Sequence, residues 1–329
     1  MSPGEVLAYL AGVVDGDGYL KVVKETTSSL TRQYRANVGV QQLWPGKAVR
    51  LFASTRGGTV TTPRVPPGRR PLARCELYSR KAEAAVRRLL PYLLLKKDQA
   101  LLLLELARLK RAPRSEPSGR YRGFETIREA VLALHDGSWK DAASPLPLSP
   151  SLLGYERLSP RALGWTREQT CAYLAGVMDS DGSFRVERRL VEGMLGPHYR
   201  ISIRCAQVAP SRAVDLFAET FGGRLTARKS ARPNHRDLVS WSLHDRAAMR
   251  AIERLIPYLV VKQAEAYLLL DLRRLKAEGK KGLTEWVHAN RWREFARMRK
   301  RCYTTGQVAE FERIHRAVQA LHSGGPRPS

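Results

Sequence analysis

The stretch Leu10-Ala-Gly-Val-Val-Asp-Gly-Asp-Gly18 decides the fold, because it returns as Leu174-Ala-Gly-Val-Met-Asp-Ser-Asp-Gly182 in the second half of the 329 residues. In each copy, apolar residues recur near the helical period and lead directly into two acids, which predicts a short helix that ends in carboxylates. The small residues of each copy share one stripe: Ala8, Ala11 and Gly12, then Ala172, Ala175 and Gly176. We therefore expect the two helices to pack with their backbones almost touching.

The acids at the end of each copy need an electrostatic explanation. The C-terminal end of a helix carries free carbonyls and the negative end of the macrodipole, so an acid there is disfavoured by about 0.3 to 1 kcal/mol. A divalent cation that takes oxygen ligands would offset this repulsion. An Asp-Gly turn is the alternative for a single copy, and an EF-hand is disfavoured because Tyr19 and Thr26 stand where its ligands belong. The duplication favours a two-fold site.

The similarity between the halves extends far beyond the acids, as a self-comparison shows. The matched stretches include Tyr34-Arg35 with Tyr199-Arg200, Gln42 with Gln207, Pro45 with Pro210, Leu90-Pro-Tyr with Ile256-Pro-Tyr, and Phe124-Glu with Phe311-Glu. In the second half, alternating residues predict strands at 183–188, 200–207, 225–228 and 239–243, and helical patterns fall at 213–221, 247–259 and 264–275. Each half is thus predicted to be helix, two strands, helix, two strands, helix and an outer helix, which is an α+β arrangement.

The repeat also predicts the domain organisation. We expect an N-terminal domain at 1–140, a linker at 141–165 in which Pro, Ser and Leu dominate, and a C-terminal domain at 166–329. The second half is longer, and its extra residues fall in a basic stretch near 284–302. That stretch is expected to be helical, and either grips phosphates or is simply a solvated helix.

The composition narrows the class of partner. A formal net charge of +26 costs stability through self-repulsion and points to an anionic partner, either nucleic acid or a membrane face. No apolar stretch approaches the roughly 20 residues of a membrane span, and the first residues lack a signal-peptide layout. The four cysteines show no metal-site spacing, so we expect reduced thiols. The expected location is intracellular, cytoplasmic or nucleoid-associated, with an organelle not excluded.

Cationic and amide side chains in the predicted strands favour nucleic acid over a membrane. They are mostly spaced two apart and so share one face of a sheet, where a two-stranded ribbon fits the DNA major groove. They are Lys21, Arg35, Asn37 and Gln41 in the first half, and Arg185, Arg200, Ser202, Arg204, Arg224, Thr226 and Arg228 in the second. For any single arginine a solvated face is the alternative. Prolines at 63, 66, 67 and 71 should shorten the third strand or confine it to an edge, which leaves readout there to the loop residues Arg64, Arg69 and Arg70.

The motif pair, with Lys96 and Lys262 downstream, resembles the LAGLIDADG homing endonucleases in their single-chain form with two motifs. The resemblance implies two pseudo-symmetric αββαββα domains packed through their motif helices, and two antiparallel sheets that form a saddle over double-stranded DNA. It implies Mg²⁺ held by Asp17 and Asp181 with the backbone carbonyls of Gly16 and Ser180. It also implies that Lys96 and Lys262 lie near the scissile phosphates, and that Gln42 and Gln207 order water around the metals. Asp15 and Asp179 are expected to cap backbone amides.

The expected function is that of a monomeric, Mg²⁺-dependent, site-specific endonuclease. The resemblance implies that it cuts both strands of a long, pseudo-palindromic DNA target, leaves short 3′ overhangs and promotes intron mobility. An RNA maturase that binds intron RNA on the same fold is the main alternative, and a DNA-binding regulator with relic motifs is a third. Both acids and both lysines are present, which argues against a purely binding role because nothing structural requires all four.

Overall fold

The chain forms two similar halves, as the sequence predicts. The computed structural model describes residues 1–26, 32–66, 68–112, 117–136, 163–189, 198–230, 236–288 and 305–323. Each half carries the order αββαββα around a four-stranded antiparallel sheet, so the predicted α+β class and its internal repeat are confirmed. The expected linker at 141–165 and the basic stretch near 284–302 lie almost entirely outside the described residues.

The first half contains four strands and five α-helices within the described residues. Its elements are α1 Pro3–Asp17, β1 Gly18–Thr26, β2 Arg32–Leu43, α2 Lys47–Arg56, β3 Val60–Thr61, β4 Leu72–Tyr78, α3 Ser79–Leu89, the 3-10 turn η1 Leu90–Tyr92, α4 Lys97–Arg111 and α5 Pro117–Asp136. The strand β3 has only two residues, so the shortening that the nearby prolines predict is confirmed.

The second half repeats this order with a longer fourth helix. Its elements are α7 Arg167–Asp181, β5 Gly182–Arg189, β6 His198–Val208, α8 Arg212–Phe221, β7 Arg224–Arg228, β8 Leu238–His244, α9 Asp245–Leu255, α10 Gln263–His288 and α12 Thr305–Ser323. The helix predicted at 247–259 instead ends at Leu255, because Pro257 has no N–H with which to continue the helical hydrogen bonds. The helix predicted at 264–275 extends to His288.

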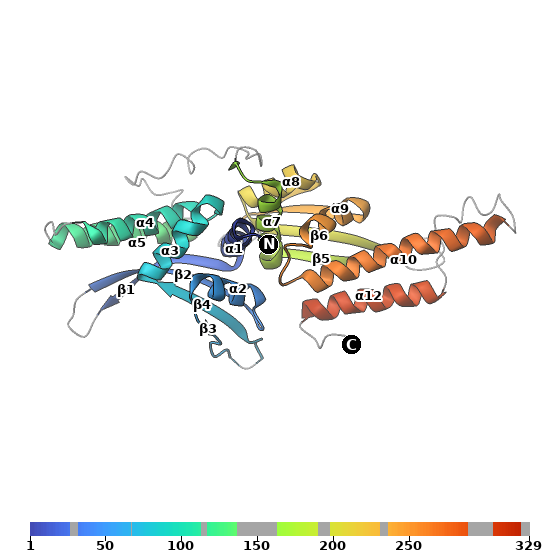
Figure 1. Ribbon diagram of the computed structural model, residues 1–329, viewed down its shortest axis with the longest axis horizontal. Helices are drawn as coiled ribbons and strands as arrows, with labels where there is room; N and C mark the ends of the chain where they lie inside the picture. The colour runs from blue at the N-terminus through green and yellow to red at the C-terminus, as the bar shows by residue number, and fades with distance from the viewer. Residues whose placement is uncertain are drawn as a thin grey trace.

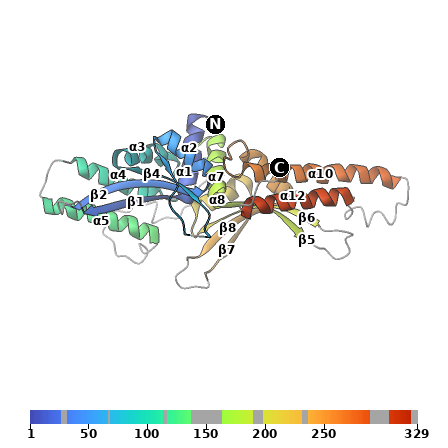
Figure 2. The same cartoon turned by 90° about the horizontal axis from the view of Figure 1, so that it is seen from below.

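Within the described residues, each sheet turns one face to a helical layer, and no helix covers its other, bare face (Figures 1 and 2). The strand orders are β1-β2-β4-β3 and β5-β6-β8-β7. Apolar side chains at alternate positions, such as Leu20 opposite Val38 and Phe184 opposite Ile203, are buried under the helices. Figure 1 shows the outer helices α4 and α5 at one end of the molecule and α10 and α12 at the other. The bare faces carry the polar positions of the strands.

The helices α1 and α7 lie side by side at the centre, between the two sheets (Figures 1 and 2). Each begins with a capping box, in which Ser2 and Glu5, or Thr166 and Gln169, satisfy the free amides of the first turn. Both helices are apolar almost all round, as a helix buried between two domains must be. The described cysteines, Cys75, Cys171 and Cys205, are buried free thiols. In the described part of the chain, none of the helices has the length and apolarity that crossing a bilayer requires.

Candidate active site

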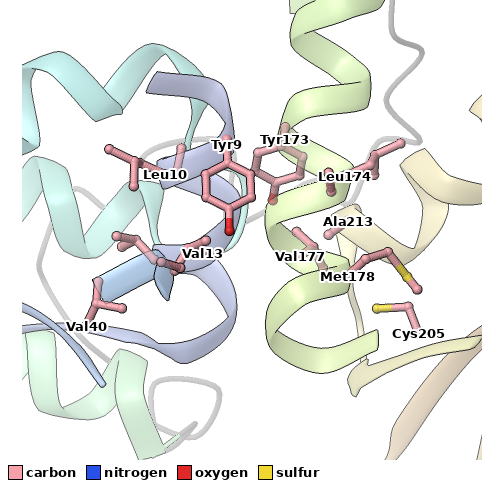
Figure 3. Close-up of a cluster of buried hydrophobic side chains, with 14 of the residues drawn as sticks. Tyr9, Leu10, Val13, Val40, Tyr173, Leu174, Val177, Met178, Cys205 and Ala213 are labelled. Atoms are coloured by element: carbon pink, nitrogen blue, oxygen red, sulfur yellow. The ribbon is translucent and has the colours of Figure 1, made fainter. Parts of the chain in front are cut away.

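The two motif helices touch through their glycines. A methyl group built on Gly12 would lie 2.1 Å from the carbonyl oxygen of Tyr173, and one on Gly176 would lie 2.1 Å from that of Tyr9. Only a hydrogen at these two positions allows such an approach, so the backbones are in direct contact as the stripe of small residues predicts. Figure 3 shows Tyr9 and Tyr173 at this junction, one from each helix. The consequence is that the C-terminal ends of both helices, with their acids, come together.

Asp17 and Asp181 are the last residues of these helices and share one site. A methyl group on Gly16 would lie 2.4 Å from Ser180 Cβ and 3.0 Å from Asp181 Oδ2, which shows how closely the two ends approach. Burial raises the pKa of Asp17, the hydrogen bond from Gln42 lowers it, and the charge of Asp181 raises it again. Two carboxylates held this close repel each other unless a cation lies between them.

One glutamine serves each acid. Gln42 Nε2 donates to Asp17 Oδ2 at 2.8 Å, and Gln207 Nε2 donates to Asp181 Oδ2 at 2.9 Å. Both glutamines stand at the C-terminal end of the second strand of their sheet and are largely buried. The sequence places them near the acids, and the structure adds that each holds its carboxylate directly.

The first acid of each motif holds the chain rather than facing the shared site. Asp15 accepts hydrogen bonds from the amides of Leu94, Leu95 and Lys96 at 2.8 to 3.1 Å, and Asp179 accepts those of Val260, Val261 and Lys262 at 2.8 to 3.0 Å. This is the amide-capping role that we expected for these two acids.

A tyrosine from the opposite half completes each of these networks. Tyr173 Oη donates to Asp15 and Tyr9 Oη donates to Asp179, both at 2.8 Å. Each motif helix therefore holds, through its first acid, the loop of its own half that leads to Lys96 or Lys262. Through the tyrosine, it is also tied to the motif helix of the other half. Burial next to an acid raises the pKa of both tyrosines far above the ordinary value, so they stay protonated donors.

Replacing one of these tyrosines should loosen the junction measurably. Tyr173→Phe removes one neutral donor from Asp15, which keeps its three amide partners, so we expect a loss of about 1 to 2 kcal/mol in the free energy of unfolding. Urea denaturation of the variant beside Tyr121→Phe, an exposed tyrosine on α5, measures this. Equal stability of the two variants would contradict a structural role for the bridge.

The lysines that follow these loops are half-buried, and their ammonium groups pack against the helix ends. Lys96 Nζ donates to the carbonyls of Val14 and Asp15, both at 2.7 Å, and to that of Gly16 at 3.2 Å. Lys262 Nζ donates in the same way to Met178 at 2.7 Å, Ser180 at 3.2 Å and Gly182 at 2.9 Å. Burial lowers the pKa of both ammonium groups, while the nearby acids oppose that shift. The two lysines thus place positive charge on the free carbonyls, beside the acid pair.

The donor set fits a hard divalent cation. The described residues contain no cluster of three or more His, Cys, Asp or Glu side chains that could hold a metal. Mg²⁺ does not need such a cluster, because it binds through one or two carboxylates and keeps water or phosphate oxygens as its remaining ligands. Asp17 and Asp181, with the carbonyls of Gly16 and Ser180 beside them, supply oxygen donors of this kind.

The predicted cationic positions lie on the bare faces of the sheets. In the second half, Arg185 stands opposite Ser202, Arg204 opposite Ser242, and Arg224 opposite the same Ser242 on its other side. The register therefore places all seven predicted residues of this half on one face. In the first half, Lys21 stands opposite Asn37, and Gln41 opposite Arg74.

Two of the predicted contact residues are buried within the sheet. Asn37 is fully buried and its amide donates to the carbonyl of Leu77, and Ser202 is only 4 % exposed. Both are short side chains between longer neighbours on the adjacent strands, Lys21 and Tyr78 for Asn37 and Arg185 and His244 for Ser202. Their neighbours therefore cover these two side chains in the protein without a ligand.

Known structures share this architecture. The LAGLIDADG homing endonuclease I-GzeII in complex with its DNA target matches with a TM-score of 0.63 at 15% identity, over 94% of this chain and 97% of that chain. I-SmaMI bound to cleaved DNA matches with 0.62 at 13% identity, over 94% and 95%. I-SmaMI bound to uncleaved DNA in the presence of calcium ions matches with 0.60 at 13% identity, over 95% and 98%.

This chain has the LAGLIDADG fold. No protein-family model matches its sequence, and no curated protein matches it significantly. The likeness to the solved structures covers both halves, so the LAGLIDADG architecture extends over nearly the whole chain.

Sequence reasoning missed part of the bare face of the first LAGLIDADG half. The ring of Tyr19 lies across Gly39, where a methyl group would come within 2.3 Å, and its hydroxyl donates to Glu76. Lys21 lies 4.7 Å from the centre of this ring, and Arg74 donates to Gln41 at 2.8 Å. The sequence did carry a signal for Arg74 and Glu76. They alternate along β4, and Arg74 pairs with Gln41 of β2, so both lie on the same face of the sheet as Gln41.

The loop of the first half presents its arginines separately from the sheet. Arg64, Arg69 and Arg70 are exposed and lie between β3 and β4, outside both strands. The strand β7 of the second LAGLIDADG half, in contrast, is five residues long and exposed throughout. The two halves therefore present their cations differently, one through a loop and the other through an edge strand.

Proposed function

We propose that this protein is a monomeric, Mg²⁺-dependent endonuclease that cuts both strands of a long, pseudo-palindromic DNA site, leaves short 3′ overhangs and promotes intron mobility. The observation that carries the proposal is the pairing of Asp17 with Asp181 at the junction of α1 and α7, between two sheet faces that carry cationic side chains. The DNA complexes of I-GzeII and I-SmaMI, which share the fold, support double-stranded DNA as the ligand.

The chemistry follows from which residues face the acid pair. Hydrolysis of a phosphodiester needs positive charge on the developing anion and an activated water in line with the leaving oxygen. Bound Mg²⁺ supplies both, because it polarises a phosphate oxygen and lowers the pKa of a water ligand. In this proposal Asp17 and Asp181 hold the metal, with help from the carbonyls of Gly16 and Ser180.

The remaining residues of the site orient the acids and bind the substrate. Gln42 and Gln207 fix the rotation of the two carboxylates through the hydrogen bonds described above, and order water beside them. Lys96 and Lys262 hold the helix ends and add positive charge next to the acid pair, close to where the scissile phosphates would lie. Lys21, Arg35 and Gln41, with the cations of the second sheet, contact phosphates and base edges along the duplex.

A direct test is cleavage of a randomised DNA library by the purified protein, with Mg²⁺ and separately with Ca²⁺. We expect cutting at one long site with short 3′ overhangs in Mg²⁺ only, and intact bound DNA in Ca²⁺, as in the uncleaved I-SmaMI complex. Absence of any cut in Mg²⁺, together with tight and salt-sensitive binding of RNA, would overturn the proposal in favour of a maturase.

Neutralising the exposed edge strand should weaken DNA binding in a salt-dependent way. Arg224→Gln and Arg228→Gln each remove a cation from β7, so we expect affinity to fall and the slope of log K against log salt to decrease by about 1 for each phosphate that is no longer neutralised. Fluorescence anisotropy at several salt concentrations measures the slope. Arg108→Gln on α4, an arginine paired with Glu105, is the matched control and should leave the slope unchanged. An unchanged slope in both β7 variants would exclude this strand from the interface.

A further inference from the structure

The two glutamines of the site occupy equivalent positions in the repeat but have different surroundings. Both donate to the final acid of their own motif, and both side chains are about 8% exposed. The side-chain oxygens of the two glutamines differ in their hydrogen bonds. Gln207 Oε1 accepts a hydrogen bond from the hydroxyl of Ser211 at 2.5 Å, whereas Gln42 Oε1 is buried and has no hydrogen-bond partner in the part of the chain that the structure describes.

The difference arises from one position of the repeat. Pro45 matches Pro210, so the residue that corresponds to Ser211 is Gly46. Gly46 has a positive φ of 59°, and a Cβ there would lie 2.3 Å from Ala73 Cβ. The first half therefore has no room for a side chain that reaches Gln42. Ser211 has an extended backbone and is only 1% exposed, which holds its hydroxyl against Gln207.

An amide held by two hydrogen-bond partners is more restrained than an amide held by one. Asp181 only accepts, so it fixes which end of the Gln207 amide faces it, and the Ser211 hydroxyl adds a second contact, to the amide oxygen. Gln42 is oriented by Asp17 alone. Gln207 therefore holds Asp181 through a more restrained side chain than Gln42 offers to Asp17, and such preorganisation speeds a reaction.

We propose that Ser211 is a positioning residue for Gln207, and that the half-site containing Asp181 consequently cuts its DNA strand before the half-site containing Asp17 cuts the other. This inference rests on the proposed endonuclease function. It implies that the native protein passes through a nicked intermediate, in which one particular DNA strand is already cut and the other is intact.

The test follows each strand separately. The cleaved site is prepared as a duplex with a different fluorescent label on each strand, and single-turnover rates are measured for the native protein, Ser211→Ala and Ser211→Thr. We expect Ser211→Ala to slow, by about three- to tenfold, only the strand that the native protein cuts first, which is the range that one hydrogen bond supports. Ser211→Thr keeps the hydroxyl and is expected to restore the native order.

Ser211 also caps α8, because its Oγ accepts the amide of Val214 at 3.3 Å, so a second comparison separates the two roles. In a Gln207→Ala background, removal of the Ser211 hydroxyl should cause no further loss of rate, since the group it positions is gone. An equal slowing of both strands, or the same loss with and without Gln207, would overturn the positioning role. If the native protein cuts no DNA, the proposed function itself fails, and the inference with it.

Discussion

Asp17→Asn is expected to abolish double-strand cleavage while DNA binding survives, and Asp181→Asn is expected to do the same. The substitution keeps the shape of the side chain but removes the negative charge that would hold the metal. Loss of the several kcal/mol that a metal contributes to the transition state corresponds to a rate decrease of about 10³-fold or more. Cleavage of a labelled duplex in Mg²⁺, with anisotropy binding in Ca²⁺, measures both properties.

The structure provides a check that this loss is not caused by unfolding. Because burial and the charge of Asp181 raise the pKa of Asp17, its ionised form is costly in the metal-free protein. Neutralising it should therefore leave the metal-free protein at least as stable as the native one, as measured by thermal unfolding in a chelating buffer. Asp271→Asn on α10 is the control and should cut normally. Full cleavage by the Asp17 and Asp181 variants would remove those acids from the mechanism.

Gly12→Ala is expected to have the largest effect on stability. The added methyl group would have to occupy space 2.1 Å from the carbonyl oxygen of Tyr173 and 3.0 Å from the amide nitrogen of Val177, so the two helices must separate. Overpacking of a well-packed core costs typically about 1 to 3 kcal/mol, and a clash with main-chain atoms lies at or above the upper end of that range. Gly176→Ala should behave alike, because it meets Tyr9 at the same distance.

The control for the helix junction is a glycine elsewhere in a helix. Gly123 lies in α5, and a methyl group there would meet only Leu109 Cδ1 at 3.4 Å. Gly123→Ala should stabilise the protein slightly, by about 0.5 to 1 kcal/mol, because alanine favours the helix. Chemical denaturation of all three variants gives the comparison. If Gly12→Ala were as stable as Gly123→Ala, the close approach of α1 and α7 would be refuted.

Much of the fold could be predicted because its signals are local and repeated. The periodicity of the motif copies gave both central helices, and the alternation of residues 183–188 and 200–207 gave strands within two residues of their observed ends. The extra turn predicted after Leu255 was wrong, since a helical pattern of apolar residues continues past the point where Pro257 ends the helix.

The site was harder to predict where it depends on neighbours from other elements. Alternation gives the face on which Asn37 lies, but not that Lys21 and Tyr78 cover it. The repeat pointed to Lys96, but only the path of the loop after η1 shows its ammonium group on the carbonyls of α1. The difference between Gly46 and Ser211 is visible in the sequence, although its effect on the glutamines is not.

The contact between α1 and α7 is isologous, as in a homodimer. Gly12 meets Tyr173, and the equivalent Gly176 meets the equivalent Tyr9. A substitution on one side must be accommodated by the other side, so this pair of helices can change only in concert. The bare faces of the sheets have no such mutual constraint, since each described sheet pairs strands of its own half, as Arg224 with Ser242 shows. One sheet can therefore change independently of the other, and under the proposed function this allows the two halves to contact different sequences within one DNA site.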